Sequence, residues 1–101
     1  MYKRLTHIGI AVKSLESSSA LFSKLFGIAE GHTEEVVQQK VKAAFFKIGD
    51  GGIELLEPTG PDSAIAKSIE KRGEGVHHLS FEVDDIEAEI AHLKKEGFQM
   101  I

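Results

Sequence analysis

The 101-residue sequence predicts an α+β domain in which a βαβββ unit is followed by the start (βα) of a second unit of the same kind. Two observations lead to this fold class. Strand-like stretches alternate apolar with small or polar residues, and stretches with the period of an amphipathic helix lie between them. In addition, residues 6–16 align without gaps on residues 77–87, at a constant offset of 71 residues. Such self-similarity indicates a duplicated unit.

The first unit is expected to occupy residues 1–58. Residues 3–12 alternate as a strand does, and residues 15–26 have the pattern of a helix. Ser14 is a suitable N-cap for this helix, and Gly27 is a suitable residue to end it. The helix is expected to bury an apolar stripe formed by Leu15, Phe22, Leu25 and Phe26.

The rest of the first unit is expected to be three strands. Residues 28–40 are mostly polar, and Val36 to Gln39 indicates the end of a strand followed by a turn. Residues 41–48 and 53–57 are rich in strand-forming side chains. The glycine-rich segment 49–52 between them predicts a hairpin turn, because glycine readily adopts positive φ.

A connection over residues 59–75 is expected to contain a helix from Ala64 to Arg72, capped by Ser63. The second unit begins at residue 76, with a strand that leads into a helix ending near Glu96. Asp84 and Glu87 are expected to cap this last helix as an acidic variant of the capping box, and its buried stripe to consist of Ile86, Ile90 and Leu93.

The chain is expected to be one domain that is incomplete at its C-terminus. Phe98 to Ile101 resembles the beginning of a further strand, and a second complete unit would need three strands after residue 97. We therefore expect these 101 residues to be the front two-thirds of a longer protein. A partner chain that supplies the strands is the alternative.

Composition excludes several classes of function. The net charge is −4 and the lysines are interspersed with acidic residues, which argues against a nucleic-acid surface or an anionic membrane surface. The sequence contains no cysteine, so disulfides and thiolate chemistry are excluded. The absence of a signal peptide and of a membrane-length apolar run predicts a cytoplasmic protein.

Three residues on predicted strands are candidate metal ligands, namely His7, Glu54 and His78. The duplication places histidine at the same point of both units, and alternation gives each of the three side chains a face with small or polar neighbours. Gly9 and Ala11 beside His7 are expected to leave room for a cavity. Two imidazoles and a carboxylate suit one divalent transition metal ion, with Co, Ni, Mn and Zn all reasonable.

The other histidines are expected to be structural or exposed. His77 falls on the apolar face of its strand, so a structural role is expected. His32 is expected in a polar loop and His92 on the surface of a helix. Ser63 has two possible roles, as an N-cap or as part of a phosphate site formed by backbone amides, and the capping role is favoured.

Three segments of the sequence resemble the vicinal oxygen chelate (glyoxalase/bleomycin resistance/dioxygenase) superfamily. They are Thr-His-Ile-Gly-Ile-Ala-Val from Thr6, Ile-Glu-Leu-Leu-Glu-Pro from Ile53, and Val-His-His-Leu-Ser-Phe-Glu-Val-Asp-Asp-Ile from Val76. Within the superfamily the sequence is most similar to methylmalonyl-CoA epimerases, and next to glyoxalase I. The resemblance implies paired βαβββ units around one metal ion, with ligands at His7, Glu54 and His78, and implies a homodimer.

The resemblance also implies a chemistry. The metal ion would chelate a 2-methylmalonyl-CoA-type thioester and stabilise the enediolate-like charge that forms when the α-proton leaves. In these epimerases two glutamates exchange the proton. One is expected beyond Ile101, and the position of the other corresponds to Gln38, which cannot accept a proton at neutral pH. Glu34 or Glu35 could fill this role instead.

Three functions follow as hypotheses. The favoured one is a metal-dependent acyl-CoA epimerase, an isomerase. The second is a glyoxalase I-type lactoylglutathione lyase that acts on a glutathione adduct, and the third is a non-catalytic protein of the same fold that binds a small molecule. The resemblance also implies a last metal ligand, a C-terminal glutamate, that has no counterpart here. The 101-residue chain itself is expected to have little or no activity, because it lacks this ligand, one base and several strands.

Overall fold

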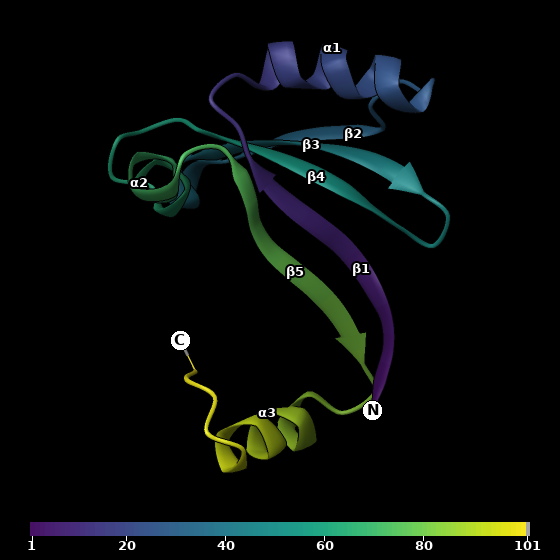
Figure 1. The fold of residues 1–101 in the computed structure, drawn as a ribbon, viewed down its shortest axis with the longest axis vertical. Helices are drawn as coiled ribbons and strands as arrows, with labels where there is room; N and C mark the ends of the chain where they lie inside the picture. The colour runs from purple at the N-terminus through teal and green to yellow at the C-terminus, as the bar shows by residue number, and fades with distance from the viewer. Residues whose placement is uncertain (101) are drawn as a thin grey trace.

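The computed structural model describes residues 1–100 and confirms the α+β class. Its strands and helices follow in the order expected, a βαβββ unit, a connecting helix, and then one strand and one helix (Figure 1). The elements are β1 (Tyr2–Ala11), α1 (Leu15–Phe26), β2 (His32–Val36), β3 (Val41–Ile48), β4 (Gly51–Pro58), α2 (Ala64–Arg72), β5 (Gly75–Val83) and α3 (Ile86–Lys95). A short 3₁₀ turn, Val37–Gln39, joins β2 to β3.

The five strands form one sheet with the order β2-β3-β4-β1-β5. Strand β1, the first strand of the first unit, lies between β4 and β5 in the sheet. It pairs in parallel with β4, the last strand of the first unit, and antiparallel with β5, the first strand of the second unit. The first three strands of the order are joined by an antiparallel ladder, with Gly49 at φ 57° in the turn between β3 and β4. The left-handed conformation at that position is the reason for glycine in the turn.

Helices α1 and α2 cover opposite faces of the sheet (Figure 1). Neighbouring residues on β4 show the alternation, because Leu55 packs beneath α1 whereas Leu56 packs beneath α2. Under α1 the buried side chains are those of Val12, Phe46 and Leu55, and under α2 they are those of Ala11, Val41, Ala43, Leu56 and Ile65. The face beneath α2 is also the face that carries His7 and Glu54.

Helix α1 has the predicted bounds and caps. The hydroxyl of Ser14 accepts a hydrogen bond from the backbone N–H of Ser17, and Gly27 ends the helix at φ 70°. The predicted stripe is correct for Leu15 and Phe22 but wrong for Leu25, whose exposed fraction is 67%. Leu15, buried Ser19 and Phe22 follow one another at the i, i+4 and i+7 positions of the face toward the sheet, and Leu25 falls outside this face.

Helix α3 lies apart from the other helices, beyond the end of β5 and beside the N-terminus (Figure 1). Its N-cap is Asp85, which accepts a hydrogen bond from the backbone N–H of Ala88, so the predicted cap at Asp84 is wrong. The predicted burial of Ile86 is also wrong, since this side chain is 63% exposed. Asp84 instead accepts a hydrogen bond from the N-terminal ammonium of Met1, at 2.8 Å.

The structure differs from the predicted pattern at the C-terminal segment and at His32. Residues 98–100 have no regular structure, so the strand predicted from Phe98 is wrong for these residues, and Ile101 lies outside the described residues. His32 begins strand β2 and does not lie in a loop, although its side chain is exposed as expected.

Among residues 1–100, no helix has the length and apolar character needed to cross a membrane.

We predict that Phe46→Ala destabilises the fold by about 3–5 kcal/mol, measured by urea denaturation. The Phe46 side chain is fully buried and contacts the rings of Phe22 and Phe26 of α1, so truncation leaves a cavity between helix and sheet. Leu21→Ala, at a 63% exposed position of the same helix, is the control and should change the free energy of unfolding by no more than about 0.5 kcal/mol. Equal effects of the two substitutions would contradict this packing.

Candidate metal centre

The three candidate ligands meet because β1 pairs with both β4 and β5. Gly9 of β1 lies opposite Glu54 of β4 on one side and opposite His78 of β5 on the other. His7 precedes Gly9 by two residues and therefore projects from the same face of β1. Side chains from three strands, 71 residues apart at the extremes, are thus brought to one point of the sheet.

Gly9 creates the space that His78 occupies. A Cβ atom at residue 9 would lie 2.6 Å from both Nδ1 and Nε2 of His78, which is closer than real contacts allow. The prediction that Gly9 leaves room is therefore correct, but the room is filled by the His78 ring. Ala11, predicted to line the same cavity, is instead buried in the core beneath α2.

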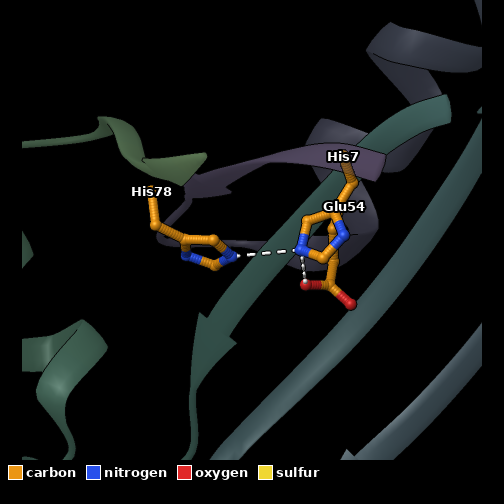
Figure 2. A group of neighbouring side chains, drawn as sticks. All are labelled: His7, Glu54 and His78. Carbon is orange, nitrogen blue, oxygen red and sulfur yellow. Dashed lines mark hydrogen bonds and ion pairs between the residues drawn. The ribbon is translucent and has the colours of Figure 1, made fainter. Parts of the chain in front are cut away.

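The rings of His7 and His78 point toward one another, and the carboxylate of Glu54 lies beside His7 (Figure 2). The Nε2 atoms of the two histidines are 3.1 Å apart, and His7 Nε2 is 3.5 Å from Glu54 Oε1. All three ligand atoms lie within 4.8 Å of one another, and all three residues are partly buried. Ligand atoms held at 2.0–2.1 Å around a tetrahedral ion are separated by roughly 3.3 Å.

The three side chains fit a metal ion because Nδ1 of each histidine, the ring nitrogen directed away from the other ligands, has a partner of its own. Nδ1 of His7 lies 3.4 Å from the Thr6 hydroxyl, and Nδ1 of His78 lies 3.0 Å from Nδ1 of His77. Each ring can therefore hold its proton on Nδ1 and present an unprotonated Nε2. Two such nitrogens and the carboxylate of Glu54 can together hold a divalent ion of the Zn type.

A pocket of about 520 Å³ opens next to the three residues, between the sheet and the start of α2. This volume lies in the range of small-molecule sites. Glu54 and His78 form part of its wall, and the wall is completed by Gln38, Gln39, Lys40, Val41, Leu56, Asp62, Ser63, Ala64, Ile65 and His77. A ligand in this pocket would therefore lie directly against two of the three candidate metal ligands.

The positions considered for a catalytic base differ in whether they line the pocket. Gln38 lines the pocket, whereas Glu34 and Glu35 lie on β2 and are not among the residues of its wall. The carboxylates in the wall are Glu54 and Asp62. Asp62 accepts a hydrogen bond from Lys40, and this contact holds the pKa of the Asp62 carboxyl below its usual value.

His77 is a pocket residue whose position the sequence pattern did not predict. Strict alternation predicted that it faces the apolar side, but its side chain lines the pocket beside His78. The cause is a β-bulge, because the pairing of β1 with β5 passes from His78 directly to Val76. Only the adjacent pair of histidines could have drawn attention to it, since a bulge depends on pairing with another strand.

The other singled-out residues behave as expected. His92 is exposed on α3, and Ser63 is the N-cap of α2, accepting a hydrogen bond from the backbone N–H of Ala66 at 3.0 Å. Ser63 is buried at the edge of the pocket. No phosphate role is needed to explain its position.

The environment of His78 favours the neutral imidazole that a metal ion requires. Burial lowers the pKa of His78 from its ordinary value near 6.5, and positive charge on His7 or His77 lowers it further, against the smaller opposing effect of Glu54. His78 therefore resists protonation at neutral pH. This is the direction that favours metal binding, because a proton and a metal ion compete for the same nitrogen.

The family comparison agrees with the fold and the geometry. The model of the Glyoxalase/Bleomycin resistance protein/Dioxygenase superfamily matches residues 6–101. The chain belongs to this superfamily, and the resemblance seen in its three sequence segments is confirmed.

Within the superfamily, relatives with a named activity include methylmalonyl-CoA epimerases. The mitochondrial human enzyme is 36% identical over 97% of this chain and 56% of its own length, and the ethylmalonyl-CoA/methylmalonyl-CoA epimerase of Cereibacter sphaeroides is 35% identical over the whole chain and 76% of its own length. The uncharacterized protein YqjC of Bacillus subtilis is 38% identical over 97% of this chain and 70% of its own length. The chain thus spans little more than half of the human relative.

Solved structures of similar proteins have the same fold as this chain. A hypothetical protein from Bacillus halodurans superimposes with a TM-score of 0.90 at 44% identity, over 97% of this chain and 71% of that one. A Streptomyces coelicolor methylmalonyl-CoA epimerase bound to 2-nitronate-propionyl-CoA superimposes with a TM-score of 0.88 at 36% identity, over 98% of this chain and 73% of that one. The βαβββ-βα arrangement is therefore the glyoxalase-like fold.

We predict that Gly9→Ala lowers the affinity for a divalent metal ion on the order of tenfold or more, measured by calorimetric titration. The added methyl group would occupy the volume of the His78 ring and displace this ligand. Gly31→Ala is the matched control, because a Cβ there meets only a backbone oxygen at 3.5 Å, an ordinary contact. Unchanged affinity in Gly9→Ala would show that His78 is not a ligand.

We also predict an acid-sensitive contribution of His78 to stability. The unfolded chain takes up a proton at this histidine near pH 6.5, whereas the folded chain does so only at lower pH. This contribution is fully present above pH 6.5 and is lost as the pH falls toward the lowered pKa. NMR titration of His78 should give a midpoint below 6.5, and urea denaturation should show a smaller loss of stability in His78→Gln over the same interval. A midpoint above 6.5 would contradict the prediction.

Proposed function

We propose that this protein is a metal-dependent epimerase of a 2-methylmalonyl-CoA-type acyl-CoA. The observation that carries the proposal is the convergence of His7, Glu54 and His78 beside the 520 Å³ pocket, whose wall includes Glu54 and His78. The relationship to epimerases of methylmalonyl-CoA over nearly the whole chain supports this substrate class.

In this proposal the three side chains hold one divalent metal ion, which supplies a positive charge for the thioester and carboxylate oxygens of the substrate. The two imidazoles present their Nε2 atoms, and Glu54 adds a negative charge to the set. The three side chains are partly buried, and electrostatic interactions with the substrate are stronger there than in bulk water. Leu56 and Ile65 give the pocket an apolar floor for the acyl group.

A proton acceptor must also face the α-carbon. Gln38 lies in the pocket wall at the position where the resemblance places a glutamate, and an amide does not accept a proton at neutral pH. This single residue favours the second candidate, a protein of the same fold that binds an acyl thioester without turnover.

The proposal extends to the metal ion, the substrate, the assembly and the cellular location. The metal ion is proposed to be Co, Ni, Mn or Zn, since each accepts imidazole and carboxylate ligands. A glutathione adduct as the alternative substrate, a homodimeric assembly and a cytoplasmic location are further parts of the proposal. A panel of acyl-CoA and glutathione substrates distinguishes the epimerase from the lyase.

The test is exchange of the substrate α-proton with deuterium from the solvent, followed by NMR or mass spectrometry on methylmalonyl-CoA. We expect Gln38→Glu to raise the metal-dependent exchange rate by about 10²- to 10⁴-fold, because it places a general base in the pocket. Gln39→Glu adds the same charge to a neighbouring wall residue and is the matched control. The proposal fails if Gln38→Glu exchanges no faster than this control.

Metal dependence is measured in parallel by elemental analysis after reconstitution. About one ion per chain is expected for the unmodified protein. His7→Ala and His78→Ala should each lose the ion, together with all exchange activity in the Gln38→Glu background. Retention of the metal in both variants would mean that the histidines are structural, and the enzymatic proposal would fall with the site.

A further inference from the structure

The residue before each of the two candidate ligands His7 and His78 is the extra residue of a β-bulge. The pairing of β1 with β5 skips Thr6 in β1 and His77 in β5. Thr6 precedes His7 and His77 precedes His78, so the two bulges occupy equivalent positions of the duplicated unit. In each case the bulge brings the side chain next to the Nδ1 atom of the following histidine.

The two partners differ in what they can do. The Thr6 hydroxyl donates a hydrogen bond to the backbone carbonyl of Ser80 at 2.9 Å, so its lone pairs are left to accept one from His7 Nδ1. Thr6 therefore favours a single tautomer of His7, with the proton on Nδ1. An imidazole such as His77 can either donate or accept through its Nδ1 atom.

His78 has one ring contact at each nitrogen. Its Nε2 lies 3.1 Å from Nε2 of His7, and its Nδ1 lies 3.0 Å from Nδ1 of His77. Each of these contacts needs one proton between two nitrogens. Since His7 keeps its proton on Nδ1, the proton between the Nε2 atoms belongs to His78, and His77 then donates to His78 Nδ1. This arrangement gives a partner to both ring nitrogens of His7 and to both ring nitrogens of His78 when no cation lies between the rings.

Metal binding requires the opposite tautomer of His78. A metal ion takes the lone pair of Nε2, so the proton of the neutral ring must be on Nδ1. His78 then donates to His77 Nδ1, and His77 carries its own proton on Nε2. Each ring has one proton before and after, and the positions are exchanged through solvent, so no acid or base is consumed by this pair.

We infer that His77 is a positioning residue for the metal centre, a hydrogen-bond partner that reverses direction when the metal ion binds. It stabilises His78 in both tautomers and holds the ring so that Nε2 points at His7 and Glu54. The inference rests on the proposed metal centre but not on the epimerase reaction. A protein that binds metal without turnover would use His77 in the same way.

The first test is the tautomer of His78, measured by two-bond ¹⁵N–¹H correlation NMR at pH 7.5 on the full chain with and without Zn²⁺. We expect the Nε2–H form of His78 without metal and the Nδ1–H form with Zn²⁺, and a matching change from Nδ1–H to Nε2–H in His77. Bound metal with an unchanged tautomer of His77 overturns the inference.

The second test is the affinity for Zn²⁺ in variants of His77. His77→Phe retains a ring of similar shape without a nitrogen, and we expect it to weaken binding by about 10- to 100-fold. His77→Asn provides a side-chain oxygen that accepts from His78 Nδ1–H, and we expect it to restore part of the affinity. His92→Phe, at the exposed histidine of α3, is the control and should bind Zn²⁺ as the unmodified chain does.

The outcomes separate the possible failures. If His77→Phe binds Zn²⁺ as tightly as the control, or if His77→Asn is no better than His77→Phe, the positioning role is wrong while the metal centre stands. If the unmodified chain binds no metal, the metal centre and this inference both fail. If His77 behaves as expected and no α-proton exchange is found, only the epimerase reaction fails.

Discussion

The position of β1 between β4 and β5 is the constraint on which the site depends. A parallel pairing on one edge and an antiparallel pairing on the other place Glu54 and His78 opposite the same residue, Gly9. Because glycine has no side chain, the His78 ring can cross above it and reach His7. A slip of one residue in either pairing would move its ligand to the opposite face of the sheet.

The two faces of the sheet have different tasks. The face beneath α1 is filled by large side chains such as Phe46 and Leu55, and it supplies much of the buried apolar surface. The face beneath α2 combines small core residues such as Ala11 and Ala43 with the pocket and the candidate ligands. Packing on one face thus holds the strands in register, while the other face keeps space for a ligand.

Gln38 and His77 give the pocket wall two side chains with different chemistry. The first is a wall residue that cannot exchange a proton, and the second is an imidazole that can donate or accept beside a candidate ligand. In the proposed function, the described residues supply the side chains that would bind the metal ion and position its ligands. Proton transfer is the part of the proposed reaction that depends on the identity of residue 38.

The sequence by itself determined the helices over 15–26 and 64–72, their caps, the succession of strands and helices along the chain, and the three candidate ligands. These follow from local periods, from capping residues and from the repeated unit, all of which are properties of a continuous segment. Only the tertiary structure decided the face of His77, the exposure of Leu25 and Ile86, and which residue fills the space over Gly9. Bulges, helix orientation and close approach across strands arise from pairing between distant segments, so no single segment encodes them.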